Sequence, residues 1–316
     1  MAFLLTFLFG HMLKLVVAAI AAIAAGAIQA AEPAARNIAA EFVTVYDATA
    51  SLPMPARVAA MRESLMAQYP EFYSRRKPAN LDKHVQRAVE EFPKIRSAYL
   101  DKAQKFGATL DQHMKTFNAS FPHYQNTTPI TLVHSLGEMD GGPRELNGKV
   151  HLVFGADMMA ELNPDGNAAP LFHHELFHIM HQQNFSCETQ PVWAALWGEG
   201  LAVYASQVLN PRANEKELLL DAPQGMAEAT RAKLPAAWAH ALSVLDNTDD
   251  KVALEMFTMS GKDATLPVRR GYYLGYLVAK EAGKTRSLAE LAALDCKQAR
   301  ALVTDTVRKL TKEAKS

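Results

Sequence analysis

The chain has 316 residues, which is enough to bury a large core as one large domain or two small ones. Lysine plus arginine and aspartate plus glutamate both number 33, so the formal net charge is zero. No basic stripe of the kind that binds nucleic acid is visible, and a nucleic-acid partner is therefore not expected. Hydrophobic residues make up 49% of the chain, which is typical of a globular protein with an apolar N-terminus.

That N-terminus is typical of a secretory signal peptide. Lys14 precedes an apolar run, Leu15–Ile28, which is followed by small residues and a polar break. Cleavage after Ala30 or Ala31 would remove residues 1–31, and we expect the mature protein in a bacterial periplasm or outside the cell, with no stable membrane span. An uncleaved membrane anchor is the alternative, because the apolar stretch approaches the roughly 17-residue minimum for a span.

From residue 37 to about 120 the pattern is helical, with apolar residues three and four apart in 56–66 and 81–92. Three prolines are expected to separate these helices: Pro70, Pro78 and Pro93. We predict a helical N-terminal region at 32–125.

The character of the chain then changes. Residues 130–136 and 149–155 are short, β-branched and bounded by glycine and proline, and they are predicted to be strands of a small sheet, with 137–148 as a loop between them. Helical patterns return at 170–184 and 191–208 and continue to about residue 312. Helices, then a small sheet, then helices predict an α+β fold that is predominantly α.

The segment 171–181 contains His174-Glu175-x-x-His178, an HExxH pattern. Residues four apart lie on one face of a helix, so the two imidazoles can bind one Zn²⁺ at about 2.0–2.1 Å each. Glu175 is expected to take a proton from the attacking water, the role this motif gives its glutamate. A histidine-bearing helix without metal is the alternative, but a half-buried imidazole cluster would then be costly to satisfy.

A catalytic zinc needs a third protein ligand and one open position. The third histidine of the metzincin pattern would fall at Asn184, so that pattern is excluded. His181 lies on the same helix, one turn beyond His178, and would leave a cramped geometry. Glu199, 21 residues after His178, is the predicted third ligand.

Helix lengths support Glu199. The first helix runs from the middle of the motif to residue 184, about 12 Å at 1.5 Å per residue, and the second runs about the same distance from Pro191 to Glu199. Glu199 therefore returns to the level of the histidines. Gly198 and Gly200 flank it, which predicts that the two helices approach closely around the metal; a helix start or kink unrelated to any site is the alternative.

The segment Trp197-Gly-Glu-Gly-Leu-Ala-Val-Tyr204 following H-E-x-x-H resembles the gluzincin group of zinc metallopeptidases, over residues 170–206. It is similar to the N-E-G-x-A-x-Y signature of their aminopeptidase-like branch, with Gly198 in place of Asn. The sequence Gly271-Tyr-Tyr-Leu-Gly-Tyr276 makes the chain similar to bacterial predicted zinc-dependent proteases. The resemblance implies one Zn²⁺ per chain, a peptide or protein substrate, and a metallopeptidase catalytic region at 126–316.

Two features depart from that pattern or extend it. The exopeptidase motif G-x-M-x-N is absent, because Gly137-Glu-Met-Asp-Gly141 ends differently, and this puts aminopeptidase activity in doubt. In gluzincins the strand before the active-site helix forms the edge on which the substrate backbone lies, and the resemblance places 149–155 there. A plain core strand is the alternative.

A second donor besides zinc would stabilise the oxyanion that forms during hydrolysis. Candidates are Tyr273, Tyr276 and His240, while Arg269 and Arg270 could bind a substrate carboxylate. The alternative for the tyrosines is core packing at helical spacing.

The chain also contains two cysteines, Cys187 and Cys296. In an exported protein an even number permits one disulfide, and two unrelated buried thiols are the alternative. For the whole protein, the alternative to a peptidase is a non-catalytic, zinc-stabilised binding protein of the cell envelope. The presence of Glu175 argues against it, because a purely structural zinc site has no use for that carboxylate.

Overall fold

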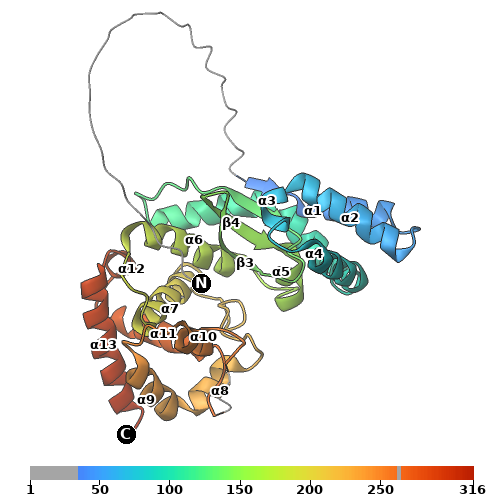
Figure 1. The fold of residues 1–316 in the computed structure, drawn as a ribbon. Coiled ribbons are helices and arrows are strands. Elements are labelled where there is room, and N and C mark those ends of the chain that lie inside the picture. The colour runs from blue at the N-terminus through green and yellow to red at the C-terminus, as the bar shows by residue number, and fades with distance from the viewer. Residues whose placement is uncertain (1–34, 262–264) are drawn as a thin grey trace, which may run out of the picture. The chain divides into compact units, whose positions relative to one another are not determined.

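The computed structural model describes residues 35–261 and 265–316, so the expected signal peptide lies outside the described residues. Helices predominate around one small sheet, which confirms the predicted α+β, predominantly α class (Figure 1). The strands are β1 (Ala35–Asn37), β2 (Ile130–Val133), β3 (Gly141–Leu146) and β4 (Lys149–Gly155). The helices are α1 (Ala39–Ala48), α2 (Met54–Gln68), α3 (Pro70–Tyr73), α4 (Pro78–Ser120), α5 (Ala156–Leu162), α6 (Ala169–Asn184), α7 (Val192–Leu209), α8 (Met226–Ala232), α9 (Leu234–Val244), α10 (Asp250–Phe257), α11 (Arg270–Ala282), α12 (Leu288–Ala292) and α13 (Cys296–Glu313).

Helix α4 continues through a proline that was expected to end it. It is 43 residues long and contains Pro93, so the prediction of a break at that position is wrong. A proline inside a helix removes one backbone hydrogen bond and costs about 3 kcal/mol. The neighbouring Phe92 and Tyr99 are fully buried against Phe42 of α1, and this packing holds the helix together across the proline.

The four strands form one sheet in the order β1-β2-β4-β3. Strands β1, β2 and β4 run parallel, and β3 pairs antiparallel with β4. The prediction of a loop over 137–148 is therefore wrong, because β3 lies within it. Asn147 and Gly148, with φ of 52° and 74°, make a two-residue turn into β4, which is the turn that an Asn-Gly pair favours.

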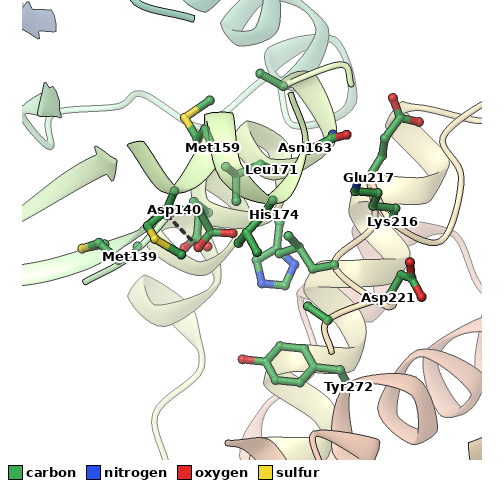
Figure 2. A pocket seen from close by; sticks show the side chains of 18 of the residues that line it. Met139, Asp140, Met159, Asn163, Leu171, His174, Lys216, Glu217, Asp221 and Tyr272 are labelled. Atoms are coloured by element: carbon green, nitrogen blue, oxygen red, sulfur yellow. Dashed lines mark hydrogen bonds between the residues drawn. The ribbon is translucent and has the colours of Figure 1, made fainter. Parts of the chain in front are cut away.

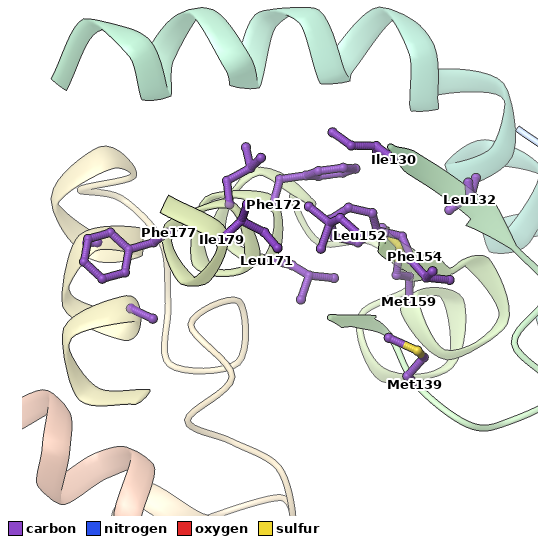
Figure 3. Close-up of a cluster of buried hydrophobic side chains, with 14 of the residues drawn as sticks. Ile130, Leu132, Met139, Leu152, Phe154, Met159, Leu171, Phe172, Phe177 and Ile179 are labelled. Carbon is purple, nitrogen blue, oxygen red and sulfur yellow. The ribbon is translucent and has the colours of Figure 1, made fainter. Parts of the chain in front are cut away.

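Helix α6 packs on this sheet through a layer of buried apolar side chains, shown in Figure 3. Phe172 of α6 packs on Phe154 of β4 with ring centroids 4.2 Å apart, and Phe106 of α4 contacts both rings. Leu152 and Phe154 are fully buried. The position of the H-E-x-x-H helix is thus set by packing on its apolar face.

On its other side α6 meets α7, and α7 in turn packs on α11 (Figure 1). The closest contact in this region joins Gly200 of α7 and Gly275 of α11: a Cβ built on Gly200 would lie 2.0 Å from the carbonyl carbon of Gly275. A Cβ on Gly198 would meet nothing within 4 Å. The prediction that both glycines serve the approach of the two metal-bearing helices is wrong, because Gly200 serves the contact with α11.

A disulfide joins Cys187, in the turn between α6 and α7, to Cys296 at the start of α13. It ties the turn between α6 and α7 to the C-terminal helix and confirms the preferred interpretation of the cysteines. Among the described residues, no helix is both long and apolar enough to cross a bilayer.

Candidate metal centre

The structure brings His174, His178 and Glu199 together. The Nε2 atoms of the two histidines lie 3.0 Å apart, and an Oε2 atom of Glu199 lies 3.5 Å from His174 Nε2 and 3.4 Å from His178 Nε2. Both imidazoles project from one face of α6, as their spacing of four residues requires. The carboxylate comes from α7. These are the three residues predicted from the sequence.

Zinc fits this triangle. Ligand atoms held tetrahedrally about 2.0–2.1 Å from one Zn²⁺ lie about 3.3–3.4 Å from one another, close to the three separations observed. Two imidazole nitrogens and one carboxylate oxygen are also the donor set of catalytic zinc sites that keep a fourth position open. Among the described residues, this is the cluster of His, Cys, Asp and Glu side chains that could hold a metal ion.

The charges within the cluster support one another. Burial opposes ionisation of Glu199, but His178 and His174 hold the pKa of its carboxyl well below the usual range. Burial likewise disfavours a charged His178, yet Glu199 raises its pKa to about 9. A negatively charged oxygen therefore faces two imidazole nitrogens, and a divalent cation bound there would take the place of the proton on His178.

Glu175 lies beside the cluster without being one of its three members. It is buried, and burial raises the pKa of its carboxyl although His174 and His178 act in the opposite direction. It packs against the start of β3: a Cβ on Gly141 would lie 3.1 Å from Cγ of Glu175, and one on Gly142 would lie 3.7 Å from its Oε2. The absence of side chains at these two glycines leaves room for the carboxylate at the edge of the sheet.

The other two histidines of α6 serve the core. His181 lies between the rings of Phe177 and Phe185, with centroid separations of 5.2 and 4.7 Å, and burial lowers its pKa to about 4. It is therefore not brought into the metal cluster. Nε2 of His173 donates to the carbonyl oxygen of His113 at 3.1 Å, and its Nδ1 accepts a hydrogen bond from Asn210 at 2.8 Å.

The cluster opens into a cavity of about 1080 Å³, part of which appears in Figure 2. Its walls come from the loop and strand before and in β3, from α5, α6 and α7, from the segment 216–224 and from the start of α11. Asp140 stands beside Glu175 at this opening, and its negative charge helps to raise the pKa of Glu175. Asp140 was missed in the sequence, where it fell in the expected loop.

The tyrosine that lines the cavity is Tyr272, and Figure 2 shows its side chain together with that of His174. Burial and then the charge of Glu199 raise its pKa, so its hydroxyl stays protonated. The structure does not bring the predicted Tyr273 and Tyr276 to the group formed by His174, His178 and Glu199. Tyr273 accepts a hydrogen bond from Arg231 and Tyr276 donates one to Gln207, in a separate buried cluster.

Neighbouring tyrosines of α11 face different directions, because one residue corresponds to about 100° of rotation at 3.6 residues per turn. The spacing of Gly271-Tyr-Tyr-Leu-Gly-Tyr276 therefore identifies the helix but not the tyrosine that faces the site. The useful signal was Gly275, because it packs on α7 and thereby fixes the rotation of α11.

Of the other three residues proposed from the sequence, only Arg269 lines the cavity. His240 lies on α9 near Arg270 Nη2, at 3.4 Å, and does not line the cavity. Arg270 is buried, with an ion pair to Glu255 at 3.3 Å. Arg269 lines the cavity, where its guanidinium packs on the ring of Tyr272 at 4.5 Å.

The strand predicted to form the substrate-binding edge of the sheet is not at the edge. The strand expected there, 149–155, is β4, which is paired on both sides, so it is a core strand. The edge strand beside Glu175 is β3.

Comparison with known protein families, curated proteins and solved structures finds no match for this chain. Its function is therefore inferred from the residues of the site.

Proposed function

We propose that the protein is a zinc-dependent, gluzincin-like peptidase that hydrolyses peptide bonds. The observation that carries the proposal is the convergence of His174, His178 and Glu199, with ligand atoms within 4.8 Å of one another, beside a buried Glu175. The likeness of the segment 170–206 to gluzincins supports the same conclusion.

Zinc, when bound by these three residues, supplies Lewis acidity and lowers the pKa of a water molecule. Glu175 then has one task, to take the proton from the attacking water and pass it on. A carboxyl with a raised pKa suits that task, because general-base catalysis is most efficient when the pKa of the base approaches the working pH. Its side chain lies against the start of β3, beside Gly141 and Gly142.

Two further elements complete a peptidase site. Tyr272 keeps its proton and lies at the cavity wall, so its hydroxyl can donate a hydrogen bond to the developing oxyanion. The edge strand β3 offers backbone groups along which an extended peptide can add a strand. Tyr272 thus replaces Tyr273 and Tyr276 in the proposed mechanism.

Export is part of the proposal. The apolar segment before residue 31 is typical of a signal peptide, and a disulfide persists in oxidising compartments such as the periplasm. The second candidate function is a zinc-stabilised binding protein of the cell envelope, which the cavity would also suit. Glu175 distinguishes the two, because a binding protein has no need for a buried carboxylate beside the metal.

The test is Glu175→Gln, assayed on a peptide library with and without a zinc chelator. The wild type is expected to cleave some peptides in a chelator-sensitive way, and the variant to lose about 10²–10⁴-fold in rate, the usual contribution of general acid–base catalysis. Zinc content and melting temperature should barely change, because glutamine is a near-isostere. Full activity of the variant on a chelator-sensitive substrate would overturn the mechanism.

A further inference from the structure

Arg269 carries a charge that has no counter-charge among the described residues. It is half-buried in the wall of the cavity that holds the metal cluster, and its Nε is inaccessible to solvent without a hydrogen-bond partner. None of its nitrogens makes a hydrogen bond or an ion pair within the part of the chain that the structure describes. A buried donor left without an acceptor is costly, so such a group calls for an explanation.

Other arginines show how unusual this is. Arg57, Arg76 and Arg270 also have a buried nitrogen without a partner, but each bonds through another nitrogen to a carbonyl or carboxylate oxygen. Arg144, which shares the cavity with Arg269, is paired with Glu138. Of the arginines that line the cavity, Arg269 is the one without a counter-charge among the described residues.

The backbone and the neighbouring ring hold Arg269 in place. It caps the N-terminus of α11 with a φ of 56°, a left-handed conformation that non-glycine residues seldom adopt. Its guanidinium packs on the face of Tyr272, one turn further along the helix. Stacking of this kind leaves the edge of the guanidinium, with its N–H groups, available to a ligand.

Tyr272 also relates this charge to the site. Tyr272 and Arg269 line the same cavity as His174 and Glu199, so the ring that carries the arginine faces the same space as the candidate metal site. A group bound by Arg269 would therefore belong to the same substrate molecule whose peptide bond reaches the metal.

We propose that Arg269 binds a carboxylate of the substrate, so that the enzyme selects peptides with a free C-terminal carboxylate or an acidic side chain near the cleaved bond. This rests on the proposed peptidase function. The planar guanidinium can donate two parallel N–H···O bonds to a carboxylate from its two Nη groups. Asp140, Glu175 and Glu199, the acidic side chains beside the two histidines, would repel an anion, whereas Arg269 offers a positive charge in the same cavity, which Lys102 and Lys216 also line.

The experiment compares matched peptides. Each hexapeptide substrate found by library digestion is made with a C-terminal acid and with a C-terminal amide, and separately with internal Glu exchanged for Gln. The zinc-loaded wild type, Arg269→Gln, Arg269→Lys and the control Arg300→Gln are compared by kcat/KM. Arg300 is exposed on α13 and paired with Asp246, so its substitution removes the same charge outside the cavity.

We expect the wild type to prefer one acid member, C-terminal or internal, by about tenfold or more, as for a charge-assisted hydrogen bond. Arg269→Gln should cleave both members at the rate of the poorer one, Arg269→Lys should keep part of the preference, and Arg300→Gln should behave as the wild type. The pair that responds identifies the source of the carboxylate. A melting temperature close to that of the wild type shows that Arg269→Gln has folded.

Binding of the same peptides to zinc-loaded Glu175→Gln protein, with and without Arg269→Gln, is measured by calorimetry. Failure of the peptidase function would appear as a lack of chelator-sensitive cleavage, while the preference for acid over amide in binding would remain. Equal binding and cleavage of acids and amides by the wild type, or an unchanged preference after Arg269→Gln, would overturn the role of Arg269.

Discussion

Helix α7 meets its two neighbours in different ways. Towards α6 it presents Glu199, whose carboxylate stands 3.4 and 3.5 Å from two imidazole nitrogens. Towards α11 it presents Gly200, which lies so close to Gly275 that neither position has room for a side chain. One contact brings together three side chains that could hold a metal ion, and the other is close packing, although the two residues are consecutive in the chain.

This difference shows how a short signature can carry two kinds of information. A rotation of about 100° per residue points Glu199 and Gly200 to different sides of the helix. The glycine contact is nevertheless part of the site, because α11 also carries Tyr272 and follows Arg269. The close approach at Gly275 brings the start of α11 to the wall of the cavity. Helix α11, which packs on the Gly200 side of α7, therefore adds residues to the cavity beside Glu199.

The largest effect is expected when the carboxylate that α7 presents to α6 is removed. Glu199→Ala removes the proposed third metal ligand and should lower zinc affinity by more than about 100-fold, whereas loss of a neighbour that only supports a ligand costs about 10–100-fold at most. His181→Ala is the matched control, because His181 is buried between Phe177 and Phe185 instead. Zinc titration of both variants decides the question, and loss of zinc from His181→Ala alone would show that the wrong third ligand was chosen.

Next in size is the effect of Tyr272, the residue that the α11 contact delivers to the site. Tyr272→Phe removes one oxyanion donor and should lower kcat about 100-fold with zinc content unchanged. Tyr273→Phe and Tyr276→Phe lose hydrogen bonds to Arg231 and Gln207 away from the cavity, so each should cost about 1 kcal/mol of stability and leave kcat nearly intact. A fall in kcat for Tyr273→Phe with none for Tyr272→Phe would reverse the assignment.

The packing contact itself is tested by Gly200→Ala. The added methyl would lie 2.0 Å from one backbone atom of α11, and backbone cannot rotate away as a flexible side chain can. Overpacking of this kind typically costs about 1–3 kcal/mol, so the free energy of unfolding should fall by about that amount. Activity should fall as well, because the helices move apart. Denaturant unfolding measures the first effect, and an unchanged stability would mean that the two helices are not in contact at this point.

The sequence was sufficient for the parts of the site that regular helix geometry determines. His174 and His178 follow from helical spacing, and Glu199 follows from the rise per residue over two helices joined by a short turn. The helical patterns likewise gave α6 and α7 to within one residue.

What could not be predicted depends on contacts between distant elements. Strand β1 has no apolar alternation and exists because it pairs with β2, and Pro93 is tolerated because Phe92 is buried against α1. Strand β3 had a local signal in Asn147-Gly148, the turn that favours a hairpin, but its place beside Glu175 depends on how the sheet packs on α6. The choice of Tyr272 over Tyr273 depends on the rotation of α11, which the contact with Gly200 fixes.

The smallest predicted effect comes from the other glycine of the signature and has the opposite sign. Gly198 is inside α7, and a Cβ there would meet nothing within 4 Å. Glycine inside a helix is less stable than alanine by about 0.5–1 kcal/mol, because it loses more conformational freedom on folding. Gly198→Ala should therefore raise the free energy of unfolding by about that amount, while Gly200→Ala, two residues away, lowers it. The pair of variants compares the open position with the packed one on a single helix by the same chemical change. A loss of stability in both would mean that Gly198 is also in a close contact, and then the signature would be a packing motif on both sides of Glu199.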